Sequence, residues 1–500
     1  MDSRLPLLDD EAMRQFLVNG YLTLQTDMPE GFNERLCERL DATIEAEGNW
    51  GNNILPRIPE IRQIFRHPAI DGALTSLLGP NYIMHPHRYP HRNVPGSAAQ
   101  ALHKDLTHYS GDKDIQHHRT RWAMVFYYPH DVTAEMGPTS ILPGTQFYQE
   151  ESHDPDNAER LLCGKAGTAT VVNFDIWHRA TANRSPQRRY MLKFIFARME
   201  EPSGPSWRAE NPEWLPPRNG VSPDKHEVVW RSVWNWHHGR GADTPEAASA
   251  DADALAENLR LLNAGSVSER RQAANRLGLL GPMAEAAIPA LAAALRDADE
   301  PLRLNAGYAL GAIGAAAIPA LREEVRIGTE ESRRHAACGL SLIGKAAVPA
   351  LLSLAEEEDW RVRSAAVDAL SEIGPATPEV VPALDRALGD PADWVRRHAA
   401  DALGTIGKNA GAAVPALART LMDAQPYVRI NAATALAKIG PEAEEAVPAL
   451  IAALDDPDRY TRAFAAIALR RIGTPAAQEA LLDLLETARW CPITTIAKPY

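Results

Sequence analysis

The sequence predicts a multidomain protein, in which an α+β domain built around a β-sandwich or barrel is followed by an all-α solenoid of helix pairs. Three observations support this prediction. The chain has 500 residues, which is too many for one ordinary domain. Its composition changes near residue 240, because 14 of the 16 histidines precede that point and alanine dominates after residue 246. The second half repeats with a period of 30 to 33 residues, whereas the first half contains short strand-like runs.

Composition excludes several classes of protein. Hydrophobic residues make up 45% of the chain and charged residues 23%, as in ordinary globular proteins, which excludes collagen-like and wholly disordered chains. The four cysteines are far apart in the sequence and form no CxxC pair: Cys37, Cys163, Cys338 and Cys491. We therefore expect neither a disulfide framework nor a structural zinc site, and the spacing suits the reducing cytoplasm.

The net charge of −13 is shared by both halves of the chain. Residues 1–240 carry 26 basic against 30 acidic side chains, and residues 241–500 carry 26 against 35. Neither half has the basic surplus that binding to phosphates requires, so we expect no nucleic-acid partner. No run approaches the roughly 18 apolar residues of a membrane helix, and the first residues lack the apolar core of a signal peptide. We therefore expect no membrane and a cytoplasmic location.

In the first half, helical stretches come first and strand-like runs follow. We expect helices at Asp9–Val18, Phe32–Glu47 and Ile61–Leu78. Short runs rich in β-branched and aromatic residues predict strands at Met124–Tyr128, Ala169–Asn173 and Tyr190–Phe196. Gly-Pro and Pro-Gly pairs separate these runs as turns would. Helices followed by strands are typical of an α+β domain built around a sandwich or barrel.

A candidate metal-binding motif lies among these strands. In His103-Lys104-Asp105, residues i and i+2 of an extended chain present an imidazole and a carboxylate on one face. His178, where a later strand ends, is the candidate third ligand. Two histidines and one carboxylate on one side of a metal form the facial triad of non-haem Fe(II) oxygenases.

An arginine follows the third candidate ligand at a suggestive distance. Arg189 lies 11 residues after His178 and begins the next strand, in which Arg189, Met191 and Lys193 alternate with apolar residues of the opposite face. A buried arginine beside a metal can hold a dicarboxylate by a bidentate pair while the other end chelates the metal. Arg184 and Arg188 are competing candidates for this role.

The order of these parts resembles the phytanoyl-CoA dioxygenase family of Fe(II)/2-oxoglutarate oxygenases. The likeness spans residues ~8–200. It rests on DEAMRQFLVNGYLTLQ from Asp10, on the His103-Lys-Asp105 motif, on MGPTSILPGT from Met136, and on the spacing from His178 through Asn183 to Arg189. The resemblance implies a double-stranded β-helix of the jelly-roll or cupin type.

The resemblance also implies roles for individual residues. In the family, the HxD pair and the distal histidine bind iron, which here means His103, Asp105 and His178. Arg189 then holds the far carboxylate of 2-oxoglutarate, and we expect Asn183 to belong to the same cosubstrate site. O2 is the oxidant, and because related halogenases lose the carboxylate, retained Asp105 favours hydroxylation or another oxidation.

Two positions depart from the family pattern. The middle residue of the HxD motif, often glutamine in relatives, is Lys104 here, and its side chain should point away from the metal. Ala180 stands where relatives often have a small hydroxyl residue near the cosubstrate, which removes one hydrogen bond to it.

The second half is a tandem repeat with two markers of one period. Ile-Gly or Leu-Gly ends a helical run at Gly281, Gly314, Gly344, Gly374, Gly407, Gly440 and Gly473. The motif [IV]-P-A-L recurs in the same register, with proline suiting the first turn of a helix and glycine its end. Residues ~255–490 resemble HEAT repeats of the alanine-rich kind found in phycobilisome-lyase-like proteins. Helix pairs this short must stack to bury their apolar faces.

An arginine stands 11 residues before each of these glycines. The column comprises Arg270, Arg303, Arg333, Arg363, Arg396, Arg429 and Arg462. It could form a basic strip for an acidic partner. The interpretation that we favour is a ladder in which each arginine binds a turn aspartate, such as Asp359, Asp393 or Asp458, and holds adjacent repeats in register.

We therefore predict three segments: an oxygenase domain at residues 1–238, a linker at 239–254 and a HEAT-like array at 255–490. Trp230, Trp234 and Trp236 precede the linker with spacings that suggest packing between the domains. The segment from His85 to Arg92 either lines the site, with His87 or Arg88 reaching the substrate or the cosubstrate, or forms a solvated loop.

The predicted function is that of an Fe(II)/2-oxoglutarate-dependent dioxygenase. Its substrate would be an unactivated C–H bond of a small metabolite or of a docked peptide or protein. The array would dock a substrate or a protein partner on its concave face. The alternative is a non-catalytic HEAT scaffold that carries a degenerate oxygenase domain. Fold type alone does not choose the substrate.

Overall fold

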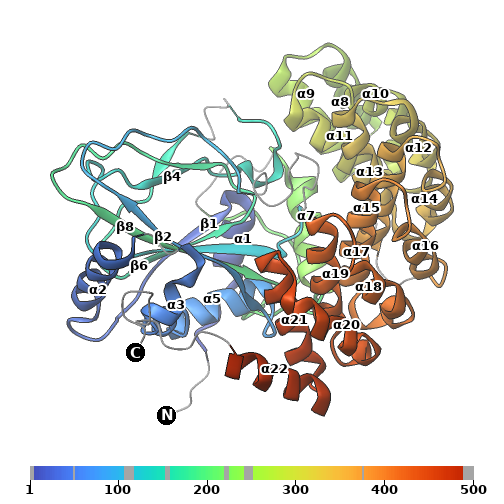
Figure 1. Cartoon of the computed structure of the whole chain (residues 1–500). Helices are drawn as coiled ribbons and strands as arrows, with labels where there is room; N and C mark the ends of the chain where they lie inside the picture. Colours follow the sequence, from blue (N-terminus) through green and yellow to red (C-terminus); the bar gives the residue numbers. More distant parts are fainter. Residues whose placement is uncertain are drawn as a thin grey trace. The chain divides into compact units, whose positions relative to one another are not determined.

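The computed structural model describes residues 5–48, 51–105, 118–152, 158–218, 225–240, 252–373 and 377–487. They form two compact units, one mainly of residues up to 218 and the other of residues 225 to 484. The first unit contains the strands labelled in Figure 1, and the second is helical throughout its described part.

The first unit is built from two antiparallel sheets. The larger sheet has the strand order β1 (Tyr21–Gln25), β6 (Thr168–Asn173), β3 (Trp122–Tyr128), β8 (Arg189–Ala197) and β2 (Ile83–Asn93). The smaller sheet has the order β5 (Arg160–Leu161), β4 (Thr139–Ile141) and β7 (His178–Ala180). This is the jelly-roll type of architecture that the sequence predicted, and the three predicted strands correspond to β3, β6 and β8.

The two faces of the larger sheet bury different side chains. Because side chains alternate along a strand, Met124, Phe126 and Tyr128 of β3 lie on one face, and the strand register puts Arg189, Met191 and Lys193 of β8 on that face too. This face belongs to a core that includes Ile141 of the smaller sheet. The opposite face is covered by helices, with the ring of Phe65 4.1 Å from that of Phe194.

Helices of the first unit cover the larger sheet (Figure 1). They are α1 (Asp10–Asn19), α2 (Phe32–Glu47), α3 (Ile54–Arg57), α4 (Ile61–Phe65) and α5 (Pro68–Leu78), with short 3-10 turns at Gly51–Asn53 and Thr145–Phe147. The helix predicted at Ile61–Leu78 is two helices, because Pro68 starts a new one and the His67 side chain accepts from the N–H of Ala69.

Strand β2 is an element that the sequence left undecided. It includes Pro86 and Pro90, which argue against a central strand, but β2 lies at the edge of the sheet, where it pairs with β8. The register shifts between Met84 and Arg88, beside the first proline. The histidine-rich segment is therefore an edge strand rather than a solvated loop.

The second unit stacks helix pairs in the predicted order. The first helices of the pairs are α8 (Ala252–Ala264), α10 (Ile288–Ala294), α12 (Ile318–Ile327), α14 (Val348–Leu354), α16 (Val380–Ala387), α18 (Val414–Thr420) and α20 (Val447–Ala452). The second helices are α9 (Val267–Leu279), α11 (Glu300–Ile313), α13 (Glu330–Ile343), α15 (Trp360–Ile373), α17 (Asp393–Ile406), α19 (Pro426–Ile439) and α21 (Arg459–Ile472). A last helix, α22 (Pro475–Thr487), follows.

The two sequence markers act as predicted. Proline occupies the first turn of α10, α12, α14, α18 and α20. The repeat glycines that the structure describes all have positive φ, from 56° at Gly281 to 91° at Gly314, a conformation that other residues rarely adopt. Gly374 lies outside the described residues. Short 3-10 helices join many repeats, at Gly281–Ala287, Ala315–Ala317, Gly344–Ala347, Gly407–Ala413 and Gly440–Ala446, and Ala453–Asp455 follows α20.

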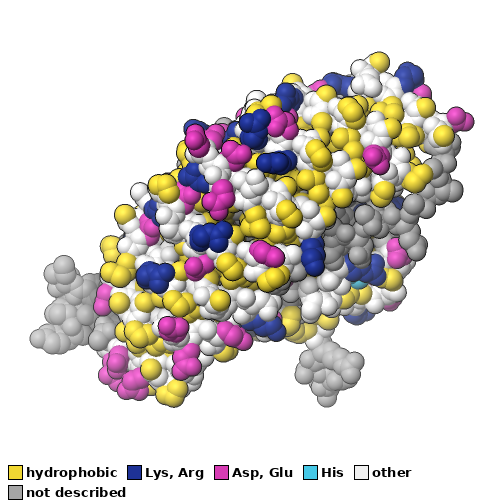
Figure 2. All heavy atoms as spheres, turned by 90° about the vertical axis from the view of Figure 1, so that its right-hand side faces the viewer, with side chains coloured by type: hydrophobic (Ala, Val, Ile, Leu, Met, Phe, Trp, Pro, Cys, Tyr) yellow, Lys and Arg dark blue, Asp and Glu magenta, His cyan; other side chains and the backbone are white. Residues whose placement is uncertain are grey.

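Four arginines of the column bind an aspartate of the next repeat and so form a ladder between repeats. The guanidinium Nε lies 2.7 Å from an aspartate of the next repeat in three successive pairs: Arg363–Asp390, Arg396–Asp423 and Arg429–Asp456. Arg270 forms the corresponding ion pair with Asp297. Arg363, Arg396 and Arg429 also donate to main-chain carbonyls of the turn before their own helix, as Arg396 does to Asp390 and Pro391. On the face of the array seen in Figure 2, basic and acidic side chains are scattered among apolar ones rather than gathered into a basic strip.

The aspartates of the ladder are not those that the sequence suggested. The predicted partners Asp359, Asp393 and Asp458 stand too close to the second helix of their repeat. Asp458, for example, accepts from the N–H groups of Tyr460 and Thr461 and so caps α21. The ladder instead uses aspartates two or three residues earlier in the turn, whose carboxylates can reach the preceding repeat.

A helix before the predicted linker packs on the array. Helix α7 (Glu227–His237) contacts α9 and α11 and is anchored at its start. The His226 ring Nδ1 lies 2.6 Å from Asn305 Oδ1, and the N–H of Val228 donates to Asn275 Oδ1 at 2.9 Å. The tryptophan cluster of α7 is thus grouped with the array. Residues 241–251 of the predicted linker lie outside the described residues, and the domain bounds drawn from the sequence remain a proposal.

One stretch of the described chain is long and apolar enough to cross a membrane, Glu330–Leu354. It consists of α13 and α14, and the chain turns between them at Gly344, where φ is 73°. Leu340 and Leu351 within it are fully buried. The stretch has the features of core helices of a repeat.

Candidate metal centre

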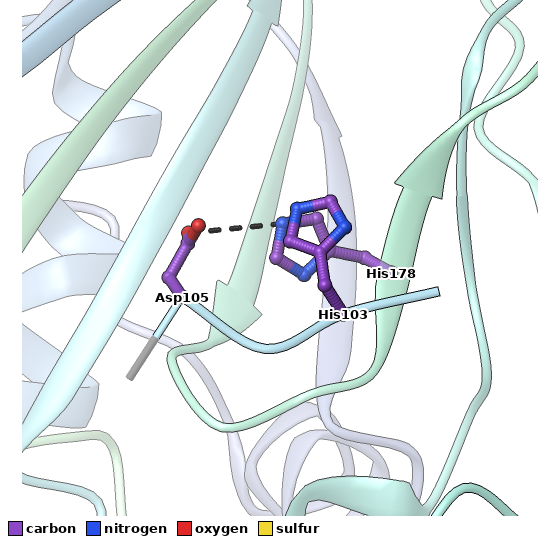
Figure 3. Close-up of side chains that lie close together, drawn as sticks. All are labelled: His103, Asp105 and His178. Atoms are coloured by element: carbon purple, nitrogen blue, oxygen red, sulfur yellow. Dashed lines mark ion pairs between the residues drawn. The ribbon is translucent and has the colours of Figure 1, made fainter. Parts of the chain in front are cut away.

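The two histidines of the predicted triad meet across a short antiparallel bridge. His103 lies outside the named strands. Its N–H donates to the carbonyl of His178 in β7, and its own carbonyl accepts from the N–H of His178, both at 3.0 Å. The bridge brings the ring centroids to 4.6 Å from one another. Two imidazoles that are 75 residues apart in the chain are thereby placed side by side (Figure 3).

Asp105 completes the cluster. Its Oδ2 lies 3.7 Å from His178 Nε2, the contact drawn in Figure 3. One candidate ligand atom from each of His103, Asp105 and His178 can be chosen so that all three lie within 4.8 Å of one another. The structure therefore brings together all three residues predicted as metal ligands. The donor set of two imidazole nitrogens and one carboxylate suits Fe(II).

The ring nitrogens are oriented for metal binding. His103 Nδ1 lies 3.0 Å from the carbonyl of Ala101, and His178 Nδ1 lies 3.1 Å from the carbonyl of Ile176. A carbonyl only accepts, so each Nδ1 carries the proton and donates. In the neutral imidazole this tautomer leaves the lone pair on Nε2, the atom that a metal would bind.

Electrostatics favour the metal-binding protonation states of Asp105 and His178. Burial alone would raise the pKa of Asp105, but the charge of Lys193 and the nearby His178 outweigh it and hold the pKa well below its usual range. Burial lowers the pKa of His178 to about 4, against a smaller opposing effect of Asp105. At neutral pH the site therefore presents a carboxylate and a neutral imidazole.

Arg189 has the environment expected of an anchor for a carboxylate. Its side chain is only 1% exposed, and its Nε and Nη2 donate to the carbonyl of Gly137 at 3.1 and 2.7 Å. Its Nη1 has no hydrogen-bond partner among the described residues. Burial lowers the pKa of the Arg189 guanidinium. A buried guanidinium without a counter-charge is costly, so this side chain fits a site for an anionic ligand.

The competing arginines have other surroundings. Arg188 is exposed and pairs with Asp41, and Arg184 is exposed as well. Arg189 is therefore the buried member of the three.

Asn183 supports this region through the backbone. Its amide donates to the carbonyls of Asn93 and Gln187 at 3.0 and 2.8 Å, and its Oδ1 accepts from the N–H and hydroxyl of Ser185. These bonds use both amide hydrogens and two acceptor positions. We infer that Asn183 shapes the turn that leads to Arg189, so its predicted direct contact with the cosubstrate remains only a prediction.

Two residues at the site escaped prediction. Lys193, four residues after Arg189 on the same face of β8, places its Nζ 2.5 Å from Asp105 Oδ2. His91 of β2 lies opposite Met191, and its Nε2 is buried with no hydrogen-bond partner in the described part of the chain. Burial, then Lys193, lowers the pKa of His91 well below its usual range. The alternation of β8 pointed to Lys193, but the pairing of β2 with β8 could not be known.

Lys104 behaves as expected. Although it lies between two candidate ligands in the sequence, its Nζ lies over the ring of Trp177, 5.9 Å from the centroid. The side chain of Lys104 therefore points away from the candidate metal ligands, whereas that of Asp105 points toward the two histidines.

A jelly-roll that gathers two histidines and an aspartate near a buried arginine has the architecture of a dioxygenase-type domain. Residues 38–191 match the family model described as phytanoyl-CoA dioxygenase (PhyH). Residues 255–341, 325–404, 348–422 and 414–493 match the model of HEAT repeats. The chain therefore carries a PhyH-type domain followed by HEAT repeats, as the resemblance in the sequence indicated.

Solved structures with similarity to the chain include non-haem enzymes. The α-ketoglutarate-dependent carbocyclase SnoK from nogalamycin biosynthesis is 19% identical, with 39% of this chain and 85% of that chain covered and a TM-score of 0.32. The non-haem monooxygenase ThoJ in a nickel complex is 18% identical, with 43% and 90% covered and a TM-score of 0.31. EctD from S. alaskensis with bound Fe is 15% identical, with 40% and 79% covered and a TM-score of 0.34.

Proposed function

We propose that the chain is an Fe(II)- and 2-oxoglutarate-dependent dioxygenase that hydroxylates an unactivated C–H bond of a small metabolite or a docked peptide. One observation carries the proposal. Candidate ligand atoms of His103, Asp105 and His178 lie within 4.8 Å of one another in a domain that also buries Arg189 with its Nη1 lacking a partner among the described residues.

Each residue has a definite task in this proposal. His103 and His178 offer Nε2, because their Nδ1 atoms donate to carbonyls, and Asp105 offers a carboxylate oxygen. Arg189 binds the far carboxylate of 2-oxoglutarate. Bound Fe(II) supplies the oxidative chemistry, in which 2-oxoglutarate and O2 yield succinate and CO2 and one oxygen atom enters the substrate.

The surroundings limit the access of water. The fully buried ring of Phe126 lies 5.8 Å from the ring of His178. Met191, also buried, lies between Arg189 and Lys193 on the face of β8 that both share. Apolar walls strengthen the electrostatic interactions of the charged groups between them.

Succinate release tests the proposal directly. The iron-loaded protein is incubated with 2-oxoglutarate and O2 against a panel of metabolites and peptides, with Asp105→Ala as the matched control. Succinate that depends on both a panel member and Asp105 supports a hydroxylase and names its substrate class. Equal succinate from both proteins across the panel would leave the alternative, a HEAT scaffold with a degenerate oxygenase domain.

We further propose that the HEAT array docks a protein or peptide on its concave face, since stacked helix pairs generate such surfaces and HEAT repeats commonly mediate protein interactions. The acidic charge of the second half favours a basic or neutral partner over nucleic acid. If a peptide emerges from the panel, its full-length form should show a lower KM than its short reactive segment. Equal KM values would restrict the array to another role.

A further inference from the structure

A lysine occupies the position beside the candidate metal ligand Asp105. Lys193 is 5% exposed and its Nζ lies 2.5 Å from Asp105 Oδ2. The same oxygen faces His178 Nε2 at 3.7 Å. A cation bound between Asp105 and His178 would therefore share this carboxylate with a buried ammonium group.

The position of Lys193 follows from the register of the sheet. Strand β8 pairs with β3 on one side and β2 on the other, so Lys193 lies between Phe126 and Tyr89. Aromatic neighbours offer the ammonium no counter-charge, and Lys193 forms its ion pair with Asp105. The pair is buried at both ends, with 6% and 7% of the side chains exposed.

Buried charges of this kind depend on one another. A buried carboxylate that loses its only close cation is strongly destabilising, whereas replacement of both partners by neutral groups can be harmless. A divalent cation at Asp105 would supply a counter-charge of its own but would also be repelled by the ammonium at short range in a medium of low dielectric constant.

We propose that Lys193 is a built-in counter-ion of Asp105, which holds the carboxylate in place before metal binds and weakens the hold of the site on the metal. This inference rests on the proposed function, because it concerns the same metal site. Lys193 is a positioning residue in this account, since it acts through Asp105. The site would then bind its metal less tightly than its three ligands alone would allow.

Metal binding without cosubstrate tests this role. Mn2+ affinity is measured by electron paramagnetic resonance of the free ion, for the whole chain and for Lys193→Met, a change that keeps most of the side-chain volume and removes the charge. Lys193→Met should bind Mn2+ about tenfold or more tightly, because both the competitor and the repulsion are gone. Unchanged or weaker Mn2+ binding would overturn the inference.

Lys104→Met is the matched control. Lys104 is buried to a similar degree and is adjacent to Asp105 in the chain, but its ammonium lies over Trp177. If Lys104→Met tightened Mn2+ binding as much as Lys193→Met, the effect would be one of general charge, and the specific role of Lys193 would be lost.

Stability gives a second readout. Without metal, Lys193→Met should unfold at a lower temperature than the parent chain, and saturating Mn2+ should restore most of the difference. The double variant Asp105→Asn with Lys193→Met should recover stability without metal, because no unpaired charge remains. If Lys193→Met alone does not fold, the double variant still tests the inference. A double variant that also fails to fold would contradict a counter-ion role for Lys193.

Parallel measurements on Asp105→Ala separate this inference from the proposed function. If the parent chain binds Mn2+ no better than Asp105→Ala, the metal site and the inference both fail. If binding depends on Asp105 but Lys193→Met does not tighten it, only the inference fails. If Lys193→Met alters only the 2-oxoglutarate requirement, Lys193 is a ligand anchor and the counter-ion role is wrong.

Discussion

Asp105 has two roles at the candidate site, as a metal ligand and as the partner of a buried lysine. It is buried, it faces the imidazole of His178 and it pairs with Lys193. Its pKa is held below its usual value by Lys193 and His178 against the effect of burial, so it is a carboxylate at neutral pH. We therefore expect substitution of this carboxylate to lower the metal content of the protein.

Asp105→Ala should abolish stoichiometric metal binding and succinate formation, because two imidazoles alone leave a mobile metal. Metal content after dialysis, measured by atomic absorption, checks this. Asp131→Ala is the control, since Asp131 is exposed and pairs with the exposed Lys165. A chain with Asp105→Ala that kept its iron would show that the site has been misassigned.

Arg189→Ala should raise the 2-oxoglutarate concentration needed for half-maximal turnover by at least about tenfold, because a charge-assisted hydrogen bond contributes about 1.5–3 kcal/mol. Arg188→Ala is the matched control, being adjacent but exposed and paired with Asp41. Initial rates of succinate formation against 2-oxoglutarate concentration give both values. Similar shifts in the two variants would leave the anchor unidentified.

His85 makes the first unit sensitive to acid. Its ring is buried against Trp122, and its Nδ1 accepts from the N–H of His87. Burial, then His87 and Arg88, lowers the pKa of His85 to about 3 from 6.5. The unfolded chain takes up this proton below pH 6.5 while the folded chain does not, so stability is lost as the pH falls through this window.

His85→Asn keeps an acceptor for His87 and cannot become charged. It should reduce the acid-induced loss of unfolding free energy by about 1.4 kcal/mol per pH unit below pH 6.5, the slope for one proton. Urea unfolding of both proteins over a series of pH values measures the slope. Parallel curves would mean that His85 is already charged in the folded state.

At the scale of elements, the arginine ladder is the clearest stabilising device. Arg396 and Asp423 are 16% and 11% exposed in their ion pair, and Arg396 also binds two carbonyls of its own turn. Arg396→Ala should lower the unfolding free energy by about 1–3 kcal/mol, because the buried acceptors lose their donor. Arg361→Ala should change it by less than about 0.5 kcal/mol, because Arg361 is 55% exposed and lies 3.6 Å from Asp359.

Chemical unfolding of the two variants beside the parent chain measures this difference. Equal, small effects would indicate that stacking of the helices alone sets the register of the repeats.

The elements also show what the sequence could and could not predict. Repeats were readable because proline and glycine mark the ends of each helix in local chemistry. The three candidate ligands could be proposed because HxD is local and His178 shortly follows the recognisable strand Thr168–Asn173, although His178 begins β7 and does not end a strand as expected. Strand β2 could not be predicted, because Pro86 and Pro90 are unusual in strands other than edge strands. The contact between Lys193 and Asp105 could not be predicted either, because it depends on the pairing of strands far apart in the chain.

At the scale of the whole molecule, the two units differ in what they respond to. All three candidate metal ligands lie in the first unit. Saturating Mn2+ should therefore raise the unfolding temperature of one calorimetric transition and leave that of the array unchanged, because a ligand stabilises only the unit that binds it. A single transition that shifts as a whole would mean that the units unfold together.

The packing of α7 on α9 and α11 determines where the chain can be cut into two fragments without breaking these contacts. A fragment that stopped in the small-residue segment after Arg240 would carry α7 away from Asn275 and Asn305, which hold its start. The remaining fragment would lose the same bonds from the other side. Cloning boundaries placed between Arg218 and Lys225 would keep every one of these hydrogen bonds within a single fragment, so an expression trial that compares the two cuts reports on which helix is the true beginning of the array.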